Sequence, residues 1–190
     1  MKEVLLDKKY YLLTWEDIQK ATDILCSKIK KTFQPGLIIG IMRGGMIVVN
    51  LISDCLGVPR VYAIGVRHYE GIDKRGSLEV YQPLPSSLEL YEHNVLLVDE
   101  VSDTGKTFKN VVESQIKPRN PKEVRTASLY IKPWTDFVPD FFVYCVDGWL
   151  IFPWDYYETM RHLRRELERK YSKEEADEIL RKKFGYNFMY

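Results

Sequence analysis

A stretch near the middle of the chain decides the fold: Val95-Leu96-Leu97-Val98-Asp99-Glu100-Val101-Ser102-Asp103-Thr104-Gly105-Lys106-Thr107. It begins with four consecutive apolar residues, a pattern typical of a strand buried on both faces of a parallel sheet. Two acidic residues follow, and a turn rich in glycine and hydroxyl groups leads into the next helical segment. Because open α/β sheets bind ligands at the carboxyl ends of their strands, this stretch predicts a binding site.

The residues of the turn indicate a ribose that carries one phosphate. Successive backbone amides over Thr104-Gly105-Lys106-Thr107, at the start of a helix, can bind an anion, and the threonine hydroxyls add donors. Asp99 and Glu100 would repel a polyphosphate chain, but they suit the two hydroxyls of a sugar diol and a bridging Mg²⁺. Taken singly, the acidic pair also fits a solvated strand end, and Asp103 fits an N-cap of the following helix.

A nucleotide-triphosphatase P-loop is the competing interpretation, since this chain also has Gly105-Lys106-Thr107. The P-loop pattern requires a second glycine five residues before the Gly-Lys pair. This chain has Glu100 at that position, so we exclude the P-loop.

The flanking segments predict alternating strands and helices. Thr14 followed by Asp17 is typical of a helix N-terminus, and apolar residues then recur with a helical period over residues 15–32. We expect further helices over 46–56 and 104–116, and further strands over 37–42, 61–66, 123–131 and 141–146. The fold class is therefore α/β, a mainly parallel sheet of about five strands flanked by helices, with a small hood.

Two regions lack this rhythm. Residues 67–94 mix glycine, proline, tyrosine and charges without a sustained period, and we expect a mobile lid loop there. From Tyr156 onward, charges alternate in sign as on a solvated helical face. We expect one domain over 1–190, with a core over about 37–155 and a helical extension over about 156–190.

Composition excludes several classes of protein. The 190 residues carry a formal charge of +1, so no overall field attracts nucleic acid or an anionic membrane, and we expect neither partner. No run approaches the roughly 18 apolar residues that span a bilayer, and residues 1–9 contain no signal core, so we expect a cytoplasmic protein. The three cysteines are far apart and lack metal-ligand spacing; we expect them buried and reduced. Likewise, no histidine has partners at the spacing of a metal site or a nucleophilic triad.

The segment Val95 to Thr107 resembles the defining motif of the type I phosphoribosyltransferases, an apolar strand, two acidic residues and then D-T-G-x-T. The resemblance covers about residues 37–155 and is strongest to the 6-oxopurine (hypoxanthine/xanthine-guanine) enzymes. It implies that Asp99 and Glu100 hold the ribose hydroxyls of phosphoribosyl pyrophosphate, directly or through Mg²⁺. It also implies that the 5-phosphate is bound by Asp103, Thr104, Gly105, Lys106 and Thr107.

The resemblance assigns a second loop to pyrophosphate. Arg43-Gly44-Gly45 follows a predicted strand and is similar to the family's pyrophosphate loop, where glycines allow close backbone approach and arginine grips phosphate oxygens. An ordinary strand-to-helix turn fits the same residues. The family pattern places a cis peptide at Met42-Arg43. Arg67 would also reach pyrophosphate, and Tyr69 would fold over the site with the lid, although the rest of that loop departs from the family pattern.

The same resemblance indicates the residues that recognise the base. Lys132 matches the lysine that donates to the O6 atom of a 6-oxopurine, although a solvated lysine at a strand end fits too. Trp149 would stack on the purine and Leu150 would contact it through its main chain, whereas Phe152 and Trp154 suit core packing better. Asp103 would face N7 of the base and assist removal of its proton.

The resemblance therefore implies a Mg²⁺-dependent purine-salvage enzyme, a homodimer or homotetramer that joins phosphoribosyl pyrophosphate to hypoxanthine, guanine or xanthine and releases pyrophosphate. Two alternatives remain open. One is the same chemistry on adenine or another nucleobase, which Lys132 opposes if its ammonium points into the pocket. The other is a non-catalytic sensor of phosphoribosyl pyrophosphate, which the near-zero net charge and the retained Arg43 and Asp103 oppose.

Overall fold

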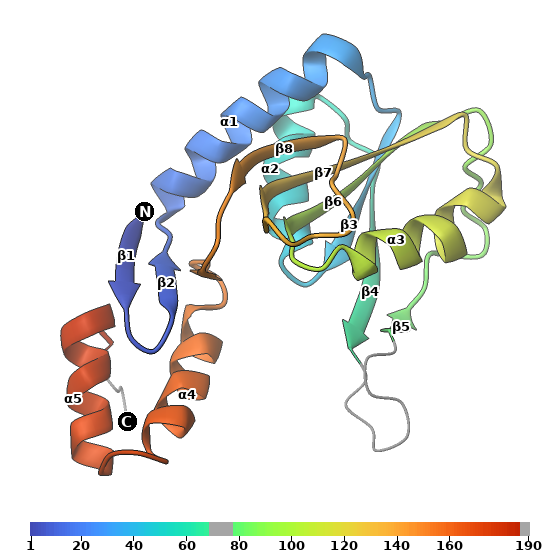
Figure 1. The fold of residues 1–190 in the computed structure, drawn as a ribbon. Coiled ribbons are helices and arrows are strands. Elements are labelled where there is room, and N and C mark those ends of the chain that lie inside the picture. Colours follow the sequence, from blue (N-terminus) through green and yellow to red (C-terminus); the bar gives the residue numbers. More distant parts are fainter. Residues whose placement is uncertain (69–77, 187–190) are drawn as a thin grey trace. The chain divides into compact units, whose positions relative to one another are not determined.

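The computed structural model describes residues 1–68 and 78–186 (Figure 1). Tyr69, the predicted lid residue, lies outside these ranges. The chain divides into two compact units, one formed by Met1–Ile18 with Asp147–Tyr190 and the other by Gln19–Val146. The prediction of one domain with an extension beginning near residue 156 stays a prediction.

The larger unit is built on a six-stranded sheet in the order β5-β4-β3-β6-β7-β8. Neighbouring strands are parallel except β5, which pairs antiparallel with β4. The strands are β3 (Leu37–Met42), β4 (Val61–His68), β5 (Leu78–Gln82), β6 (Asn94–Ser102), β7 (Glu123–Ile131) and β8 (Phe141–Cys145). The helices are α1 (Trp15–Thr32), which starts in the smaller unit, α2 (Gly45–Leu56) and α3 (Lys106–Val111); α3 continues into a π turn (Val112–Ile116) and a 3₁₀ turn (Lys117–Arg119).

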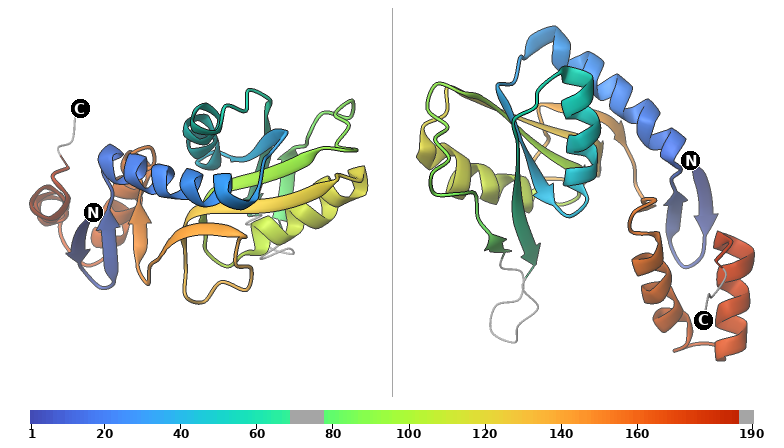
Figure 2. Two further views of the ribbon diagram at one scale, coloured as in Figure 1. Left: turned by 90° about the horizontal axis from the view of Figure 1, so that it is seen from above. Right: turned by 180° about the vertical axis from the view of Figure 1, so that it is seen from behind.

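Alternate residues of the central strands pack on opposite faces of the sheet. Leu37 and Ile39 of β3 belong to one buried cluster with Phe108 and Val111 of α3. Gly40, which points to the other face, lies against Val49 of α2, where an added Cβ would come within 2.9 Å of the valine side chain. Thus α2 and α3 cover opposite faces (Figure 2, left), and the predicted α/β fold with a mostly parallel sheet is confirmed.

The expectation of an irregular segment throughout residues 67–94 is wrong at β5. The run Leu78–Gln82 alternates apolar and polar side chains over only five residues, too short for a clear period, but it pairs with β4 at the edge of the sheet. Three leucines that follow it, Leu84, Leu88 and Leu90, are buried. Pairing and burial therefore hold the described part of this segment on the sheet.

The smaller unit combines the two ends of the chain. Strands β1 (Lys2–Leu5), β2 (Lys9–Leu12) and β9 (Trp149–Ile151) form a three-stranded sheet in which β2 and β9 are parallel. The helices α4 (Tyr156–Leu167) and α5 (Lys173–Phe184) pack on this sheet around a buried cluster. The helix expected from Tyr156 onward is confirmed. The buried members of the cluster are Val4, Tyr10, Ile151, Met160, Leu163, Leu180 and Phe184.

Helix boundaries in this unit follow from local capping. The Thr14 hydroxyl accepts from the Asp17 amide at 3.2 Å, and the Asp17 carboxylate accepts from the Thr14 amide at 2.9 Å, as the sequence predicts. Ser172 and Glu175 form the same reciprocal arrangement at the start of α5. Among the helices of the described ranges, none is long and apolar enough to cross a membrane.

The cysteines are free, as expected, but they are not all buried. Cys26 on α1 is buried, and this burial raises the pKa of its thiol to about 12. Cys145 is exposed, which corrects the expectation, because it ends β8 at the edge of the sheet.

Candidate active site

The order of strands reverses between β3 and β6. From β3 the chain first builds β4 and β5 on one side and then β6, β7 and β8 on the other. The loops that leave β3 and β6 therefore meet where open α/β sheets bind ligands. These loops are Arg43-Gly44-Gly45 and Asp103-Thr104-Gly105, so two of the predicted binding segments lie at this point.

The two glycines of the first loop lie against the acidic pair of β6. A Cβ added to Gly44 would collide with the carboxylate of Glu100, and a Cβ added to Gly45 would come within 2.8 Å of the Val98 carbonyl and 3.0 Å of Asp99 Oδ1. Glycine is therefore required at residue 45 for close approach to the β6 backbone, and a side chain at residue 44 would displace the Glu100 carboxylate, so an ordinary turn does not explain the pair. The cis peptide at Met42-Arg43, implied by the family resemblance, is present, and Arg43 is exposed beside it.

The acidic pair is half-buried rather than a solvated strand end. Asp99 Oδ1 accepts from the Glu100 amide at 3.0 Å. Burial, together with the nearby Glu100 carboxylate, raises the pKa of Asp99 well above its usual value. The Glu100 Oε2 atom is buried without a hydrogen-bond partner within residues 1–68 and 78–186. Buried acceptors normally have a partner, so this oxygen is suited to receive a ligand hydroxyl or a cation.

The turn after β6 is shaped by Gly105. Its φ of 80° is left-handed, and an added Cβ would also collide with Phe137. Gly105 is the N-cap of α3, which begins at Lys106, so the expectation that Asp103 caps this helix is wrong. The left-handed residue separates Asp103 from the helix, and the exposed Asp103 side chain accepts from Trp134 Nε1 at 2.9 Å instead.

A second loop, after β7, is bonded to this turn. The Lys132 amide donates to the Ser102 carbonyl at 3.0 Å, and the Asp136 amide donates to the Thr104 carbonyl at 3.2 Å. The Ser102 hydroxyl donates to the Phe137 carbonyl at 2.8 Å. These bonds place Lys132 and Asp103 on neighbouring, cross-linked loops of one unit.

Lys132 is 5% exposed, which excludes the interpretation as a solvated lysine. Its ammonium lies over the Trp134 ring, 5.8 Å from the centroid. A buried ammonium at a strand end needs polar or aromatic surroundings, and Trp134 provides part of them.

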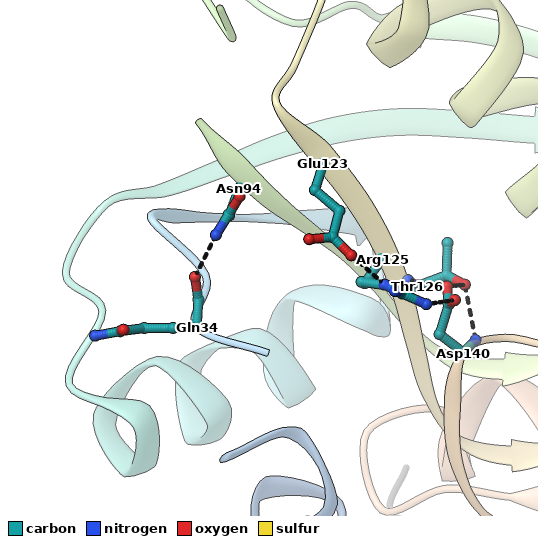
Figure 3. Close-up of polar contacts among 6 residues, drawn as sticks. All are labelled: Gln34, Asn94, Glu123, Arg125, Thr126 and Asp140. Carbon is teal, nitrogen blue, oxygen red and sulfur yellow. Dashed lines mark hydrogen bonds and ion pairs between the residues drawn. The ribbon is translucent and has the colours of Figure 1, made fainter. Parts of the chain in front are cut away.

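The same loop is anchored at its far end by residues that sequence reasoning missed. The Asp140 carboxylate accepts from the Thr126 amide and hydroxyl, both at 2.8 Å, and from Arg125 Nη1 at 2.9 Å (Figure 3). Burial opposes ionisation of Asp140, but these donors outweigh it and lower the pKa of the carboxyl. Figure 3 also shows Asn94 donating to the Gln34 carbonyl at the opposite end of β6. Aspartate is common in loops, so nothing in the sequence indicated that Asp140 would anchor this one.

The remaining predicted residues lie elsewhere in the chain. Arg67 near the end of β4 pairs with Glu79 of β5 at 2.8 Å, and its proposed contact with pyrophosphate stays a prediction. Trp149 and Leu150 belong to β9 of the smaller unit, where Leu150 is buried and Trp149 is 48% exposed. Lys8 lies over the Trp149 ring, 5.3 Å from its centroid. Phe152 is buried and stacks on Trp154 at 4.8 Å, as core packing requires.

Comparison with known proteins decides the family. The model of the phosphoribosyl transferase domain matches residues 12–160. The chain belongs to the phosphoribosyltransferase family. The matched range includes the acidic pair, the glycine loop, Lys132 and β9 of this phosphoribosyltransferase.

Individual relatives agree with this family. A xanthine-guanine phosphoribosyltransferase of Desulfotalea psychrophila is 31% identical over 151 residues, covering 78% of this chain and 88% of the relative. One from Idiomarina loihiensis is 29% identical over 150 residues, covering 76% and 86%. The crystal structure of a purine phosphoribosyltransferase from Pyrococcus horikoshii is similar with a TM-score of 0.69 and 36% identity, over 76% of this chain and 93% of that one.

Proposed function

We propose that this chain transfers the 5-phosphoribosyl group of phosphoribosyl pyrophosphate to N9 of a 6-oxopurine, hypoxanthine, guanine or xanthine. The C1–O bond to pyrophosphate breaks, the C1–N9 bond forms, and the proton of the base passes to a protein carboxylate. The observation that carries the proposal is the hydrogen bonding between the Lys132 loop and the Asp103 turn. These bonds hold the lysine that would recognise a carbonyl of the base close to the turn that would bind the phosphate.

The acidic pair would hold the ribose. The two vicinal hydroxyls can donate to Asp99 and Glu100, and this assignment is supported by Glu100 Oε2, which has no hydrogen-bond partner among the described residues. The pair also fits a Mg²⁺ ion, which binds to one or two carboxylates and takes its other ligands from substrate and water. The described ranges contain no group of three or more His, Cys, Asp and Glu side chains that could hold a metal. When bound, Mg²⁺ would supply positive charge to the leaving pyrophosphate.

The two loops at the switch point would bind the phosphates. The amides and hydroxyls of Thr104, Gly105, Lys106 and Thr107, together with Asp103, would receive the 5-phosphate. The Gly44 and Gly45 backbone and the exposed Arg43 guanidinium would receive pyrophosphate, with Arg67 as a further cation. In this proposal the acidic pair would bind the sugar, the loop with Gly44 and Gly45 would bind its pyrophosphate, and the turn would bind its 5-phosphate.

The base would be recognised by groups from three segments. Lys132 would donate to O6. Asp103 would accept the proton at N7, and its negative charge would stabilise the positive charge that develops in an oxocarbenium-like transition state. Trp149 would stack on the ring, with Leu150 contributing its main chain. An ammonium has only donors, so it favours a carbonyl over the amino group of adenine.

The test is a panel of bases. Purified protein is incubated with phosphoribosyl pyrophosphate, Mg²⁺ and each purine or pyrimidine in turn, and nucleotide is measured. We expect product with 6-oxopurines and little with adenine. Product with adenine alone would show that the enzyme acts on adenine instead. Binding of phosphoribosyl pyrophosphate without product from any base would favour the non-catalytic sensor.

We further propose that the protein acts in the cytoplasm as a homodimer or homotetramer. The comparisons support a metabolic enzyme but not a particular assembly. Analytical ultracentrifugation would measure the assembly, and a monomer at micromolar concentration would contradict this part of the proposal.

A further inference from the structure

Trp134 makes two contacts that the proposed reaction does not explain. Its indole Nε1 donates to Asp103 Oδ1 at 2.9 Å, and its ring lies beneath the Lys132 ammonium at 5.8 Å. A large aromatic ring normally buries its surface, yet Trp134 is 53% exposed. Core packing therefore does not account for its position.

We infer that Trp134 is a positioning residue that sets the orientation of Asp103 and Lys132 toward the N7–O6 edge of the purine. This inference rests on the proposed function. The N7 and O6 atoms lie side by side on one edge of a 6-oxopurine, so the two groups that read them must be held in a fixed relation.

The geometry of an indole suits this task. The N–H donates in the plane of the ring, whereas a cation binds over its face, so one rigid side chain orients two charged groups in perpendicular directions. The bond to Oδ1 restrains rotation of the Asp103 carboxylate and thereby fixes the direction of its second oxygen, Oδ2. That oxygen is left for the proton at N7.

The backbone supports the same arrangement. Trp134 lies in the loop that the Ser102–Lys132 and Thr104–Asp136 bonds attach to the turn carrying Asp103. Both ends of the Trp134 segment are therefore fixed to that turn, so the backbone that carries the indole is held beside the backbone that carries the carboxylate.

The test compares Trp134→Phe, which removes the N–H and keeps a ring, with Trp134→Ala, which removes both. For Trp134→Phe we expect kcat with hypoxanthine to fall about tenfold, with the KM for phosphoribosyl pyrophosphate within about twofold of wild type. Trp134→Ala should in addition raise the KM for hypoxanthine and reduce the preference for hypoxanthine over adenine by about fivefold. Tyr91→Phe, at an exposed tyrosine of the same unit, is the control and should change none of these values.

A double-mutant comparison separates positioning from a general structural role. If Trp134 acts through Asp103, Trp134→Phe should change kcat less than about twofold in a chain that already carries Asp103→Asn. An equal loss of kcat in both backgrounds, or no loss in the wild-type background, would overturn the inference. A melting temperature lowered by about 10 °C in Trp134→Phe would also overturn it, because that shift indicates a structural role.

The proposed function and this inference fail differently. A wild-type protein inactive with every base would overturn both. An active wild type that prefers 6-oxopurines, with a Trp134→Phe variant indistinguishable from it, would overturn the role of Trp134 alone.

Discussion

The Glu100 carboxylate lies directly against the backbone of Gly44, so that a side chain at residue 44 would occupy the position of the acid. Gly44 follows β3 and Glu100 lies within β6, more than fifty positions later in the sequence, and they meet because β3 and β6 are neighbouring parallel strands. The contact joins the proposed pyrophosphate loop to the proposed ribose site.

Gly44→Ala should therefore remove activity while the fold persists. Its backbone is in the ordinary helical region, φ −67°, so the effect comes from collision with Glu100 and not from backbone strain. We expect a loss of kcat/KM of at least about a hundredfold and a destabilisation of about 1–3 kcal/mol. Steady-state kinetics and urea unfolding measure the two effects.

Gly36→Ala is the matched control for this substitution. A Cβ at residue 36 would meet its nearest neighbours at 3.7 Å, an ordinary contact. Gly44→Ala with the activity of Gly36→Ala would show that the close approach of the glycine loop to Glu100 is dispensable.

Lys132→Met should change the preference for the base. The variant keeps an unbranched side chain of similar length but loses the donor to O6. We expect kcat/KM for hypoxanthine and guanine to fall about 10- to 100-fold, as for loss of a charged hydrogen bond, while adenine is affected less. Competition assays with mixed bases measure the ratio, and an unchanged ratio would exclude Lys132 from base recognition.

The turn after β6 predicts two distinct kinetic defects. Asp103→Asn should lower kcat by about a hundredfold with little change in the affinity for phosphoribosyl pyrophosphate. The purine can still bind, but the carboxylate that accepts its proton is lost. Thr107→Val should instead raise the KM for phosphoribosyl pyrophosphate, since it removes one donor to the 5-phosphate. Equal changes of kcat and KM in both variants would contradict the separate roles.

Asp140 should stabilise the fold in a pH-dependent manner. Its pKa is lower in the folded chain than in the unfolded one, so its contribution is complete above the unfolded pKa near 4 and is lost as the pH falls through the folded pKa. Asp140→Asn should lower the free energy of unfolding by about 1–3 kcal/mol at pH 7, and the difference from wild type should shrink at pH 3.

Urea unfolding at the two pH values tests this linkage. Asp136→Asn, at an exposed aspartate of the same loop, is the control and should have little effect. A deficit in Asp140→Asn that is as large at pH 3 as at pH 7 would show that the ionised carboxylate is not its source.

Elements with a strong periodic signal could be predicted closely from the sequence. The uninterrupted apolar run Leu37–Met42 and the helical period of Trp15–Thr32 have the predicted bounds in the structure. The short strands β1, β2, β5 and β9 were missed because they have only three to five residues, and β1, β2 and β5 also mix polar side chains or tyrosine with apolar ones. Helix α5 lies within the predicted helical extension, but its separation from α4 was not predicted, although Ser172 and Glu175 form a capping box that could have indicated where α5 begins.

The candidate site could be proposed from the sequence only where a local motif carries it. Asp99, Glu100 and the Asp103–Thr107 turn lie within one short stretch, and the structure places that stretch at the switch point. The contacts of Trp134 with Asp103 and of Asp140 with Thr126 depend on how two loops meet, which no spacing in the sequence reports. The alternative interpretation of Asp103 as an N-cap is wrong because the left-handed Gly105 occupies that position.

A crystal structure with a bound nucleoside monophosphate, such as the product of hypoxanthine, tests the central claim most directly. We predict that the ribose hydroxyls lie within hydrogen-bond distance of Asp99 and Glu100 and that the phosphate lies on the amides of Thr104 to Thr107. A nucleotide bound elsewhere, with the turn empty or the two carboxylates turned away from the sugar, would contradict the account.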